Sequence, residues 1–480
     1  MTKTVRTRFA PSPTGFMHIG NFRTGLFAWL AARHAGGTFV LRLEDTDKKR
    51  EVEGSAEHIL RCFKELGLDV DEGIEAGGKY GPYKQSERLD TYKQWAQKLI
   101  DAGRAYADPY TSQEVQAFRE EAQKAKKPFL FRNHRPKNLP VWDGTQPLRL
   151  KSDPKAYQWH DKVMGDLSTG PEVVDDFVLM KSDGYPTYNF AHVVDDAEMK
   201  ISHVIRGQEF ISSTPNYLNL YEALEVTPPI FATMPHILNE QGNKKLGKRD
   251  GAKDVLDYIK DGYLPDALIS FIATLGWNDG TDQEVFTRDQ LIEKFDLSRV
   301  GKSGAQFDMR RLNWVNGHFI RQIPLDELYA NSKGYWPEEA ADATEDYKKL
   351  VLGLIQERLK FLSEIPELTR FFFIDLPIDM SLIDDNKQLK KQEKSRLVEL
   401  LQTATKSFEE NDFTSENIQN NLNTLLEETG EKPAILFSII RVATTWSPAS
   451  PALADTLAVL GKEVTLKRLM NSIDALNNEV

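Results

Sequence analysis

The feature that most constrains this chain is a turn near its start, rich in proline and glycine, which separates a strand pattern from a helix pattern. Residues 4–10 alternate as a strand does, the sequence PSPTG at 11–15 interrupts them, and apolar positions then recur at helical spacing over Gly20–Arg33. The same order repeats with a strand at 38–43 and a helix over Glu53–Leu66. This order predicts an α/β fold of the doubly wound, Rossmann type with a parallel sheet.

A charged segment and later changes of pattern divide the rest of the chain. Residues 111–137 are strongly charged and precede strand-like pieces at 147–152 and 175–184, which predicts an α+β insertion. The sheet pattern resumes around Ala191–Ile205, so we expect the insertion to split one nucleotide-binding domain into two halves. From residue 342 onward nearly every pattern is helical, which predicts an all-α carboxyl-terminal region.

At 480 residues the chain is longer than one hydrophobic core usually organises, so we expect several structural units. The two halves of the α/β domain are expected at 1–86 and 191–240, with the insertion at 87–190 between them. A further domain is expected at 241–322. The helical region at 323–480 is long enough for two subdomains, divided near residue 390.

Charge and cysteine content exclude several classes of protein. The 61 basic and 72 acidic residues give a formal net charge of −11, which argues against a protein that coats nucleic acid indiscriminately, although a local basic groove is compatible with it. Cys62 is the sole cysteine, which excludes an intramolecular disulfide and a zinc site built from several cysteines. A reducing compartment is therefore expected.

The patterning of apolar residues indicates where the protein works. The first residues lack the apolar core of a secretion signal, and no run of about 18 apolar residues occurs in the sequence. We therefore expect a cytoplasmic protein that does not associate with a membrane.

A candidate phosphate site lies in the turn at 11–21, PSPTGFMHIGN. In a doubly wound fold this turn lies at the carboxyl end of the sheet, where a helix amino terminus offers free N–H groups to phosphate. His18 and Asn21 are three residues apart and share one side of the first helical turn, while Gly15 and Gly20 permit close approach of a ligand. Alone this is a weak signal, because a histidine near a helix start is usually a cap or a surface residue.

A second basic element strengthens that interpretation. The sequence KKLGKR at 244–249 follows Gly242, and a flexible loop with several cations is suited to fold over a triphosphate. By itself such a loop is more often a solvated surface segment. The two elements together predict chemistry at a phosphoryl centre.

These two elements resemble the signatures of the class I aminoacyl-tRNA synthetases, a His-x-Gly-His type turn and a Lys-Met-Ser-Lys-Ser/Arg type loop. Further stretches are similar to the glutamyl-tRNA synthetases of bacterial type: RFAPSPTG at 8–15, RLEDTD at 42–47, YPTYNFA at 185–191, VVDD at 193–196, HVIRG at 203–207, LGW at 275–277 and DMRRLNW at 308–314. The similarity spans nearly the whole chain. It implies an α/β catalytic domain and an anticodon-binding helical region, with acceptor-stem contacts from the insertion and further stem contacts from 241–322.

The resemblance implies a ligase that forms glutamyl-adenylate from ATP and L-glutamate and then esterifies tRNA(Glu). The carboxylate attacks the α-phosphate, so alignment and charge neutralisation dominate and no side-chain nucleophile is needed. The implied catalytic residues are His18, Asn21, Lys245 and Lys248. The implied ATP-binding residues are Pro11, Gly15, His18, Gly20, Asn21, Glu209, Lys245, Leu246, Lys248 and Arg249. Mg²⁺ is implied as a counter-ion, with no side-chain metal ligands.

Selection of glutamate requires cations for its carboxylate and acceptors for its ammonium group. The resemblance places these roles on Arg8, Ser12, Glu44, Tyr188, His192 and Arg206, with Arg8 and Arg206 as the cations and Glu44 as the ammonium partner. Each of these residues also has an ordinary structural interpretation, because such residues cap, pair or pack in sheets.

Candidate tRNA contacts lie in two places. In KAKKPFLFRNHRPK at 124–137, cations alternate with Phe129 and Phe131, a composition suited to a backbone and an unstacked base. We expect contacts from Lys126, Lys127, Arg132 and Arg135 in this stretch. Arg358 falls near the place where the family inspects an anticodon base.

Two departures from the family pattern stand out. Gly247 occupies a loop position that usually carries serine, which removes a hydroxyl donor but leaves the lysines in place. The stretch YADPY at 106–110 lacks the zinc-binding cysteines of some relatives, so we expect no zinc.

Several alternatives stay open from sequence. A small-molecule adenylyltransferase shares the turn and the sheet, but such chains are usually short. A silent RNA-binding paralogue and a truncated relative that lacks the anticodon-binding region are further readings. Charging of tRNA(Gln) in addition to tRNA(Glu) is open, and a monomer is the family expectation.

Overall fold

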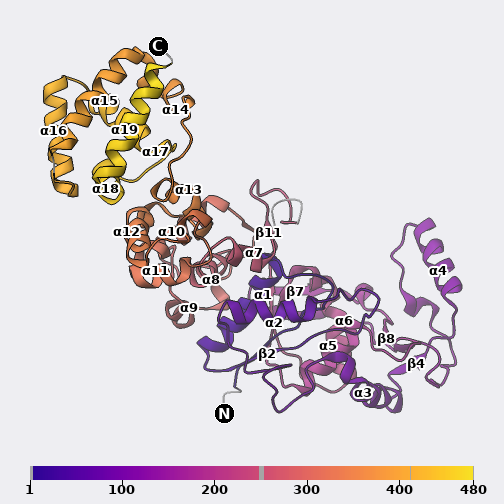
Figure 1. Cartoon of the computed structure of the whole chain (residues 1–480). Coiled ribbons are helices and arrows are strands. Elements are labelled where there is room, and N and C mark those ends of the chain that lie inside the picture. The colour runs from indigo at the N-terminus through magenta and orange to yellow at the C-terminus, as the bar shows by residue number, and fades with distance from the viewer. Residues whose placement is uncertain (1–3, 248–252, 411, 479–480) are drawn as a thin grey trace. The chain divides into compact units, whose positions relative to one another are not determined.

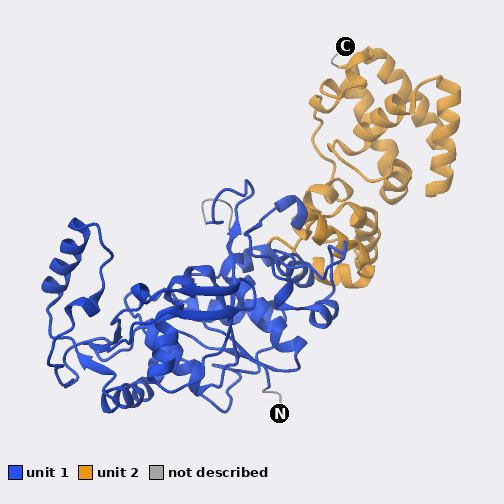
Figure 2. Ribbon diagram, turned by 180° about the vertical axis from the view of Figure 1, so that it is seen from behind, with its two compact units in different colours: residues 1–260, 265–312 blue, residues 261–264, 313–480 orange. Residues whose placement is uncertain are grey.

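The computed structural model describes residues 4–247, 253–410 and 412–478. These residues form two compact units (Figure 2). Unit 1 comprises residues 1–260 with 265–312, and unit 2 comprises 261–264 with 313–480.

Unit 1 is built on a seven-stranded sheet in the order β3-β2-β1-β9-β10-β6-β7. Its strands are β1 (Arg6–Phe9), β2 (Thr38–Leu41), β3 (Glu72–Gly73), β6 (Tyr157–Asp161), β7 (Gly165–Thr169), β9 (His203–Gly207) and β10 (Ile230–Met234). All neighbours pair in parallel except β6 and β7, which form an antiparallel hairpin at one edge. The predicted parallel, doubly wound sheet is confirmed.

Helices connect these strands (Figure 1). They are α1 (Ile19–His34), α2 (Ser55–Glu65), α5 (Tyr188–Glu198) and α6 (Thr214–Ala223). Strand β1 pairs with β9, with Thr7 opposite His203, although the two strands are far apart in the sequence. The inserted residues therefore split the domain in the sequence, as predicted, but the expected range 87–190 also includes β6 and β7, which belong to the main sheet.

The prediction of sheet structure from Ala191 to Ile205 is wrong for most of that stretch. Helix α5 ends at Glu198, and strand β9 begins at His203, so only the last three residues of this stretch are in a strand. Helix α5 is buried on several faces, because apolar Val193 and Val194 and acidic Asp195 are all inaccessible to solvent. Seven consecutive residues of α5, Phe190–Asp196, are buried, and a short buried run of this kind is not distinguished from a buried strand by its apolar pattern alone.

The insertion carries its own antiparallel sheet in the order β4-β5-β8. Its elements are α3 (Leu89–Asp101), β4 (Ala105–Ala107), α4 (Ser112–Lys124), β5 (Leu148–Leu150) and β8 (Val178–Met180). The strands predicted at 147–152 and 175–184 are present in shorter form. Thr111 caps α4 in a reciprocal capping box with Glu114, which explains why this charged helix begins there.

The remaining part of unit 1 follows β10. It contains β11 (Ile237–Leu238), α7 (Val255–Lys260), α8 (Pro265–Ala273), α9 (Arg288–Lys294) and β12 (Ala305–Gln306), with β11 and β12 paired in parallel. The boundary between the units falls within α10 (Met309–Gln322). Short 3₁₀ turns in unit 1 are Gln85–Glu87, Phe131–His134, Pro171–Val173, Gln208–Ser213 and Leu297–Arg299.

The described residues of unit 2 contain helices and no strand, as predicted. After α10 it contains α11 (Leu325–Ser332), α12 (Glu345–Ile355), α13 (Ile365–Thr369), α14 (Ser381–Asp384), α15 (Lys394–Glu409), α16 (Ser415–Thr429), α17 (Pro433–Thr445), α18 (Leu453–Leu460) and α19 (Lys462–Asn477), with 3₁₀ turns at Glu338–Ala340, Gln356–Arg358, Leu362–Glu364, Arg370–Phe372 and Leu389–Lys391. The later helices share one core of leucine and isoleucine side chains. Among the described residues of the whole chain, no helix is both long and apolar enough to span a membrane.

Candidate active site

One end of the candidate site is the start of helix α1. His18 is the N-cap, and its Nδ1 accepts a hydrogen bond from the backbone N–H of Gly20 at 3.1 Å. This hydrogen bond fixes the orientation of the imidazole ring through Nδ1 and places Nε2 at the opposite edge of the ring. A cleft begins here, lined by His18, Gly20, Asn21, Arg23, Thr24, Gly207, Glu209, Met234, Pro235, His236, Ile237, Lys245 and Leu246. Six of the predicted ATP-binding residues therefore line one cleft.

A hairpin places Lys245 at this cleft. The backbone N–H of Leu246 donates to the carbonyl of Ile237 at 2.8 Å, and the N–H of Asn239 donates to the carbonyl of Lys244 at 2.9 Å. Leu246 is buried, so it anchors the loop, while Lys245 is exposed and available to a ligand. The predicted residues Lys248 and Arg249 lie outside the described residues.

Two cleft residues, Arg23 and His236, were absent from the sequence-based prediction. Arg23 is buried in α1, and burial lowers the pKa of its guanidinium to about 10. It donates to the backbone carbonyl of Leu275 at 3.0 Å and to that of Pro235. Burial, and then the charge of Lys245, lower the pKa of His236, so this imidazole is neutral near pH 7.

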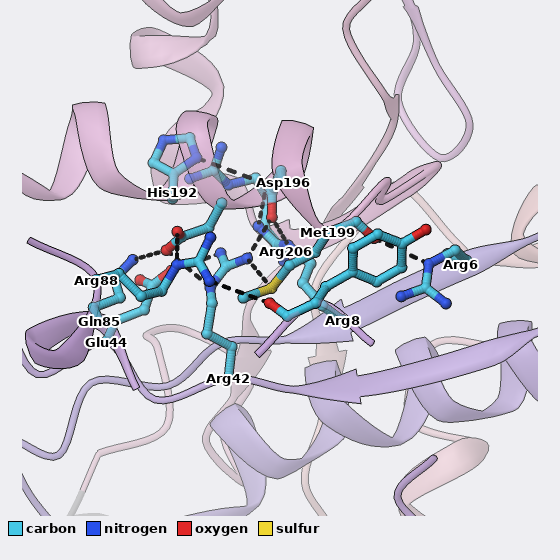
Figure 3. Close-up of polar contacts among 12 residues, drawn as sticks. Arg6, Arg8, Arg42, Glu44, Gln85, Arg88, His192, Asp196, Met199 and Arg206 are labelled. Carbon is cyan, nitrogen blue, oxygen red and sulfur yellow. Dashed lines mark hydrogen bonds and ion pairs between the residues drawn. The ribbon is translucent and has the colours of Figure 1, made fainter. Parts of the chain in front are cut away.

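The other end of the site is a buried cluster of charges (Figure 3). Arg8 comes from β1, Arg42 and Glu44 follow β2, and Arg206 comes from β9. Asp196 comes from α5 and completes the core of the cluster. It accepts hydrogen bonds from Arg8 Nε at 3.1 Å and from Arg42 Nη1 at 2.9 Å. The structure thus gathers side chains from three neighbouring strands and one helix.

Arg42 organises this cluster although it is wholly buried. Its Nη2 donates to Glu44 Oε1 at 2.9 Å, and its Nε lies 3.6 Å from Asp195 Oδ2. Asp195 also accepts hydrogen bonds from Arg88 Nε at 2.7 Å and Gln85 Nε2 at 2.8 Å. Isolated charges in a protein interior cost several kcal/mol each, so the cluster persists only because its members are paired.

The pKa values of the acidic groups differ with their partners. Burial opposes ionisation of Asp196, but the guanidinium groups of Arg8 and Arg42 hold its pKa well below the usual range. For Glu44 burial outweighs the attraction of Arg42 and Arg8, so its pKa is raised. Burial also lowers the pKa of His192 to about 3, so this imidazole is neutral near pH 7.

Several polar atoms at this end have no hydrogen-bond partner within the described part of the chain. They are Nε and Nη1 of Arg206, Nε of Arg42, Oε2 of Glu44, Oε1 of Gln85 and both ring nitrogens of His192. His192 Nδ1 lies 3.8 Å from Asp196 Oδ2, which is too long for a hydrogen bond. Arg206 Nη2 donates to the hydroxyl of Tyr188 at 2.9 Å. Buried donors and acceptors without partners indicate a site for a polar ligand.

The formal charges of the cluster do not cancel. The cations Arg8, Arg42, Arg88 and Arg206 number four, while the anions Glu44, Asp195 and Asp196 number three, so the net charge is +1. A buried site with this excess favours a ligand of net negative charge.

The remaining predicted amino-acid contacts lie beside this cluster. The rings of Tyr188 and His192 are in tilted contact, with centroids 5.0 Å apart. The carbonyl of Pro11 accepts a hydrogen bond from the N–H of Glu44 at 2.9 Å, which holds the turn that carries exposed Ser12 next to Glu44. The carbonyl of Gly15 accepts a bond from Ser55 Oγ at 2.7 Å.

The predicted tRNA contacts have different surroundings. Lys126 and Lys127 are exposed just after α4. Arg132 Nη1 donates to the carbonyls of Pro171 and Val174, and Arg135 pairs with the buried carboxylate of Asp176 at 2.5 Å. These two arginines therefore hold the insertion together, whereas the two lysines project into solvent.

The expectation that Phe131 contacts an unstacked base is wrong. Its side chain is 1% exposed and lies beneath the guanidinium of Arg149, 3.4 Å from the ring centroid. Phe129 is partly buried beside it. In unit 2, Arg358 is exposed, and burial together with the charge of Arg358 lowers the pKa of Arg441.

Comparison with known protein families assigns this fold and site to a class. Residues 4–314 match the family of class I tRNA synthetases (E and Q), catalytic domain, and residues 327–473 match the anticodon binding domain family. The fold and the site therefore define a class I aminoacyl-tRNA synthetase.

Individual relatives narrow the class. A glutamate–tRNA ligase of Dehalococcoides mccartyi is 40% identical over 486 residues, covering 99% of each chain, and one of Bacillus subtilis is 39% identical over 491 residues, covering 98% of this chain and 100% of the relative. The crystal structure of a glutamate tRNA ligase from Elizabethkingia meningosepticum, in complex with its amino acid, matches with a TM-score of 0.87 and 31% identity over 99% of this chain and 100% of that one. The chain belongs to the glutamate–tRNA ligase family. The short adenylyltransferase and the truncated relative do not explain matches of this length.

Proposed function

We propose that this chain activates L-glutamate with ATP and transfers the glutamyl group to the terminal adenosine of tRNA(Glu). The glutamate–tRNA ligases of Dehalococcoides mccartyi and Bacillus subtilis match 99% and 98% of this chain. The observation that carries the proposal is the buried, net positive cluster with unpaired donors on Arg206 and an unpaired acceptor on Glu44.

The cluster is suited to each charged group of glutamate. Arg206 carries unpaired donors on Nε and Nη1 and is the proposed cation for the side-chain carboxylate, with Arg8 as the second cation. Glu44 Oε2 is the acceptor for the α-ammonium group. Ser12, Tyr188 and neutral His192 complete the proposed amino-acid site.

Charge also explains why glutamine is a poor ligand. Glutamate carries a net charge of −1 and balances the +1 of the cluster, whereas glutamine is neutral and leaves a buried guanidinium without a partner. Sites built to bond a particular polar group reject analogues that lack it by about 10⁴–10⁵ in kcat/KM.

We propose that ATP binds at the cleft beside α1. His18 and Asn21 bind phosphates, Pro11, Gly15 and Gly20 allow close approach, and Glu209 and Leu246 line the nucleotide. Lys245, with Lys248 and Arg249, neutralises the charge that develops on pyrophosphate as the α-carboxylate oxygen attacks the α-phosphorus and the bond to the β-phosphate bridge breaks.

Mg²⁺ is proposed as the counter-ion of ATP. This cation usually binds through one or two carboxylates together with substrate phosphates. Glu209 is an exposed carboxylate in the cleft lining, so the residues present fit such an ion. When bound, Mg²⁺ would reduce the repulsion between ATP and the attacking carboxylate. We propose no zinc site at 106–110, where the hydroxyl of Tyr106 donates to buried Asp176 at 2.6 Å.

For tRNA we propose contacts from Lys126, Lys127, Arg132 and Arg135 in the insertion and from Arg358 in unit 2. The acceptor end would meet the insertion, and the anticodon would meet the helical region that matches an anticodon binding domain. No observation favours tRNA(Gln) as a further substrate. We also propose that the protein works as a cytoplasmic monomer.

Aminoacylation of separately purified tRNA(Glu) and tRNA(Gln) tests this proposal. The full chain is incubated with ATP, Mg²⁺ and radiolabelled glutamate, with glutamine and aspartate as parallel amino acids. We expect glutamyl-tRNA(Glu) alone. Failure to charge tRNA(Glu) overturns the proposed function, and charging of tRNA(Gln) overturns its restriction to one tRNA.

A further inference from the structure

A second cluster of chemically reactive side chains lies outside the catalytic site, where helix α2 packs against α7 (Figure 1). His58 and Cys62 are four residues apart on α2, so their side chains share one face. Asp254 reaches the same point from the residue just before α7. The three potential ligand atoms lie within 4.8 Å of one another.

The distances within this cluster are close to those of a metal site. Cys62 Sγ lies 3.4 Å from His58 Nε2, and His58 Nε2 lies 2.9 Å from Asp254 Oδ2. A tetrahedral zinc ion with bonds of about 2.0–2.3 Å holds its ligand atoms about 3.3–3.6 Å apart. Small side-chain rotations therefore bring a thiolate sulfur, an imidazole nitrogen and a carboxylate oxygen to one ion.

The surroundings orient two of the three ligands. Asp254 Oδ1 accepts a hydrogen bond from the backbone N–H of Leu256 at 2.8 Å, which leaves Oδ2 directed at His58. The His58 ring packs against Phe16, with centroids 4.8 Å apart, which limits its rotation. Bonds and contacts of this kind behind the ligands are typical of metal sites.

Burial and charge favour a divalent ion of borderline softness. Cys62 is fully buried, while the side chains of His58 and Asp254 are 13% and 16% exposed, so the cluster opens to solvent on one side. A thiolate and a carboxylate supply two negative charges, which a divalent cation cancels. One sulfur, one nitrogen and one oxygen ligand suit Zn²⁺ rather than Mg²⁺ or Ca²⁺.

We propose that His58, Cys62 and Asp254 form a binding site for Zn²⁺ or a similar transition-metal ion, with water as the fourth ligand. Binding exchanges the thiol S–H bond for a sulfur–metal bond and releases one proton to solvent. The single cysteine excludes a zinc site built from several cysteines, but it does not exclude this mixed one.

The site has a structural consequence for the catalytic turn. The backbone of Asp254 forms a β-bridge with His18, and the N–H of Val255 donates to the carbonyl of Met17 at 3.0 Å. A metal ion at the site would therefore connect α2 to Asp254, whose backbone pairs with His18 at the start of the nucleotide cleft.

Cobalt titration of the full, reduced and chelator-treated chain tests the proposal, because Co²⁺ in a zinc site with a thiolate ligand gives a sulfur-to-metal charge-transfer band. We expect one equivalent of Co²⁺ to saturate this band and Zn²⁺ to abolish it by displacement. Cys62→Ser should lose the band. His58→Gln and Asp254→Asn should weaken Co²⁺ binding at least about tenfold.

His160→Gln is the matched control, because His160 also pairs with an aspartate, Asp166 at 2.7 Å, but has no cysteine within its pair. This variant should bind Co²⁺ as the unsubstituted chain does. If Cys62→Ser fails to fold, as judged by circular dichroism, the His58→Gln and Asp254→Asn affinities decide the matter. The proposal is overturned if no charge-transfer band forms, or if the band forms with unchanged affinity in both of these variants.

Zn²⁺ should also raise the melting temperature of the unsubstituted chain in proportion to the logarithm of its concentration, because a ligand of the folded state stabilises it. Asp254→Asn should shift this dependence to higher Zn²⁺ concentration. An equal rise in both proteins would place the stabilising zinc elsewhere and overturn the assignment.

Discussion

At the scale of single residues, Arg42 explains how a charged site exists inside unit 1. It is wholly buried, and three carboxylates surround it: Glu44, Asp195 and Asp196. Although burial opposes it, these carboxylates raise the pKa of Arg42 well above its usual value, so it stays charged. Arg42 positions Glu44, the proposed partner of the ammonium group, and Asp196, which also pairs with Arg8.

The proposed role of the Lys245 side chain is to neutralise the charge that develops on pyrophosphate, with no part in holding the fold. Lys245→Ala should lower kcat for ATP–pyrophosphate exchange by about 10²–10³, because removal of one well-placed donor to a developing charge costs roughly this much. The KM for glutamate should change far less. Lys244→Ala is the control, since Lys244 belongs to the same hairpin but not to the cleft lining. Equal activity of the Lys245→Ala variant would contradict the role.

At the scale of secondary-structure elements, the start of α1 serves both the fold and the chemistry. His18→Ala should reduce the stability of unit 1 by about 1 kcal/mol, because it removes the N-cap acceptor. His18→Asn should recover most of that stability, since asparagine is a good N-cap, but exchange activity should stay low in both variants. Thermal melts and exchange rates separate the two roles. An Asn variant with normal activity would show that His18 only caps the helix.

Helix α5 carries a buried, neutral histidine with a consequence for stability at acid pH. The folded state binds a proton at His192 only near pH 3, whereas an unfolded histidine does so near pH 6.5. Between these values the unfolded state holds one more proton, so stability contributed by this group falls as the pH is lowered through that window, by at most about 1.4 kcal/mol per pH unit.

Urea denaturation between pH 7 and pH 5 measures this effect. His192→Gln, which has no titrating ring, should show a weaker loss of stability on acidification than the unsubstituted chain. Identical slopes for the two proteins would show that the imidazole is not kept neutral by the fold.

The elements also show what could be predicted from sequence. The turn at 11–21 and the alternation of strand and helix predicted the parallel sheet, because these signals are local. The prediction for helix α5 was wrong, because a short run of consecutive buried residues does not distinguish a helix from a buried strand. Arg132 and Arg135 looked like surface cations, and only folding shows their partners, which lie about forty residues away in the chain. Arg23 and His236 had no local signal beyond a polar residue among apolar neighbours, and the stretch 42–47 gave no indication that Arg42 would be the centre of a buried cluster.

At the scale of the whole molecule, a chain with net charge −11 must bind a polyanion through local cations. Lys126→Ala combined with Lys127→Ala should raise the KM for tRNA and make it less sensitive to salt, because each lost phosphate contact lowers the salt slope by about 0.7–1. The KM for glutamate should be unchanged. Lys93→Ala, an exposed lysine on α3, is the control. An unchanged salt slope in the double variant would remove these lysines from the interface.

We propose that the buried cluster with net charge +1 is what selects glutamate. The most direct test is kcat/KM for glutamate and for glutamine in ATP–pyrophosphate exchange, measured with tRNA(Glu) present in the unsubstituted chain, in Arg206→Gln and in the surface control Arg33→Gln. We predict a preference for glutamate of about 10⁴ in the unsubstituted chain and in the control. In Arg206→Gln this preference should collapse, mainly through lost activity with glutamate. An unchanged preference in that variant would show that the cluster does not select glutamate through Arg206.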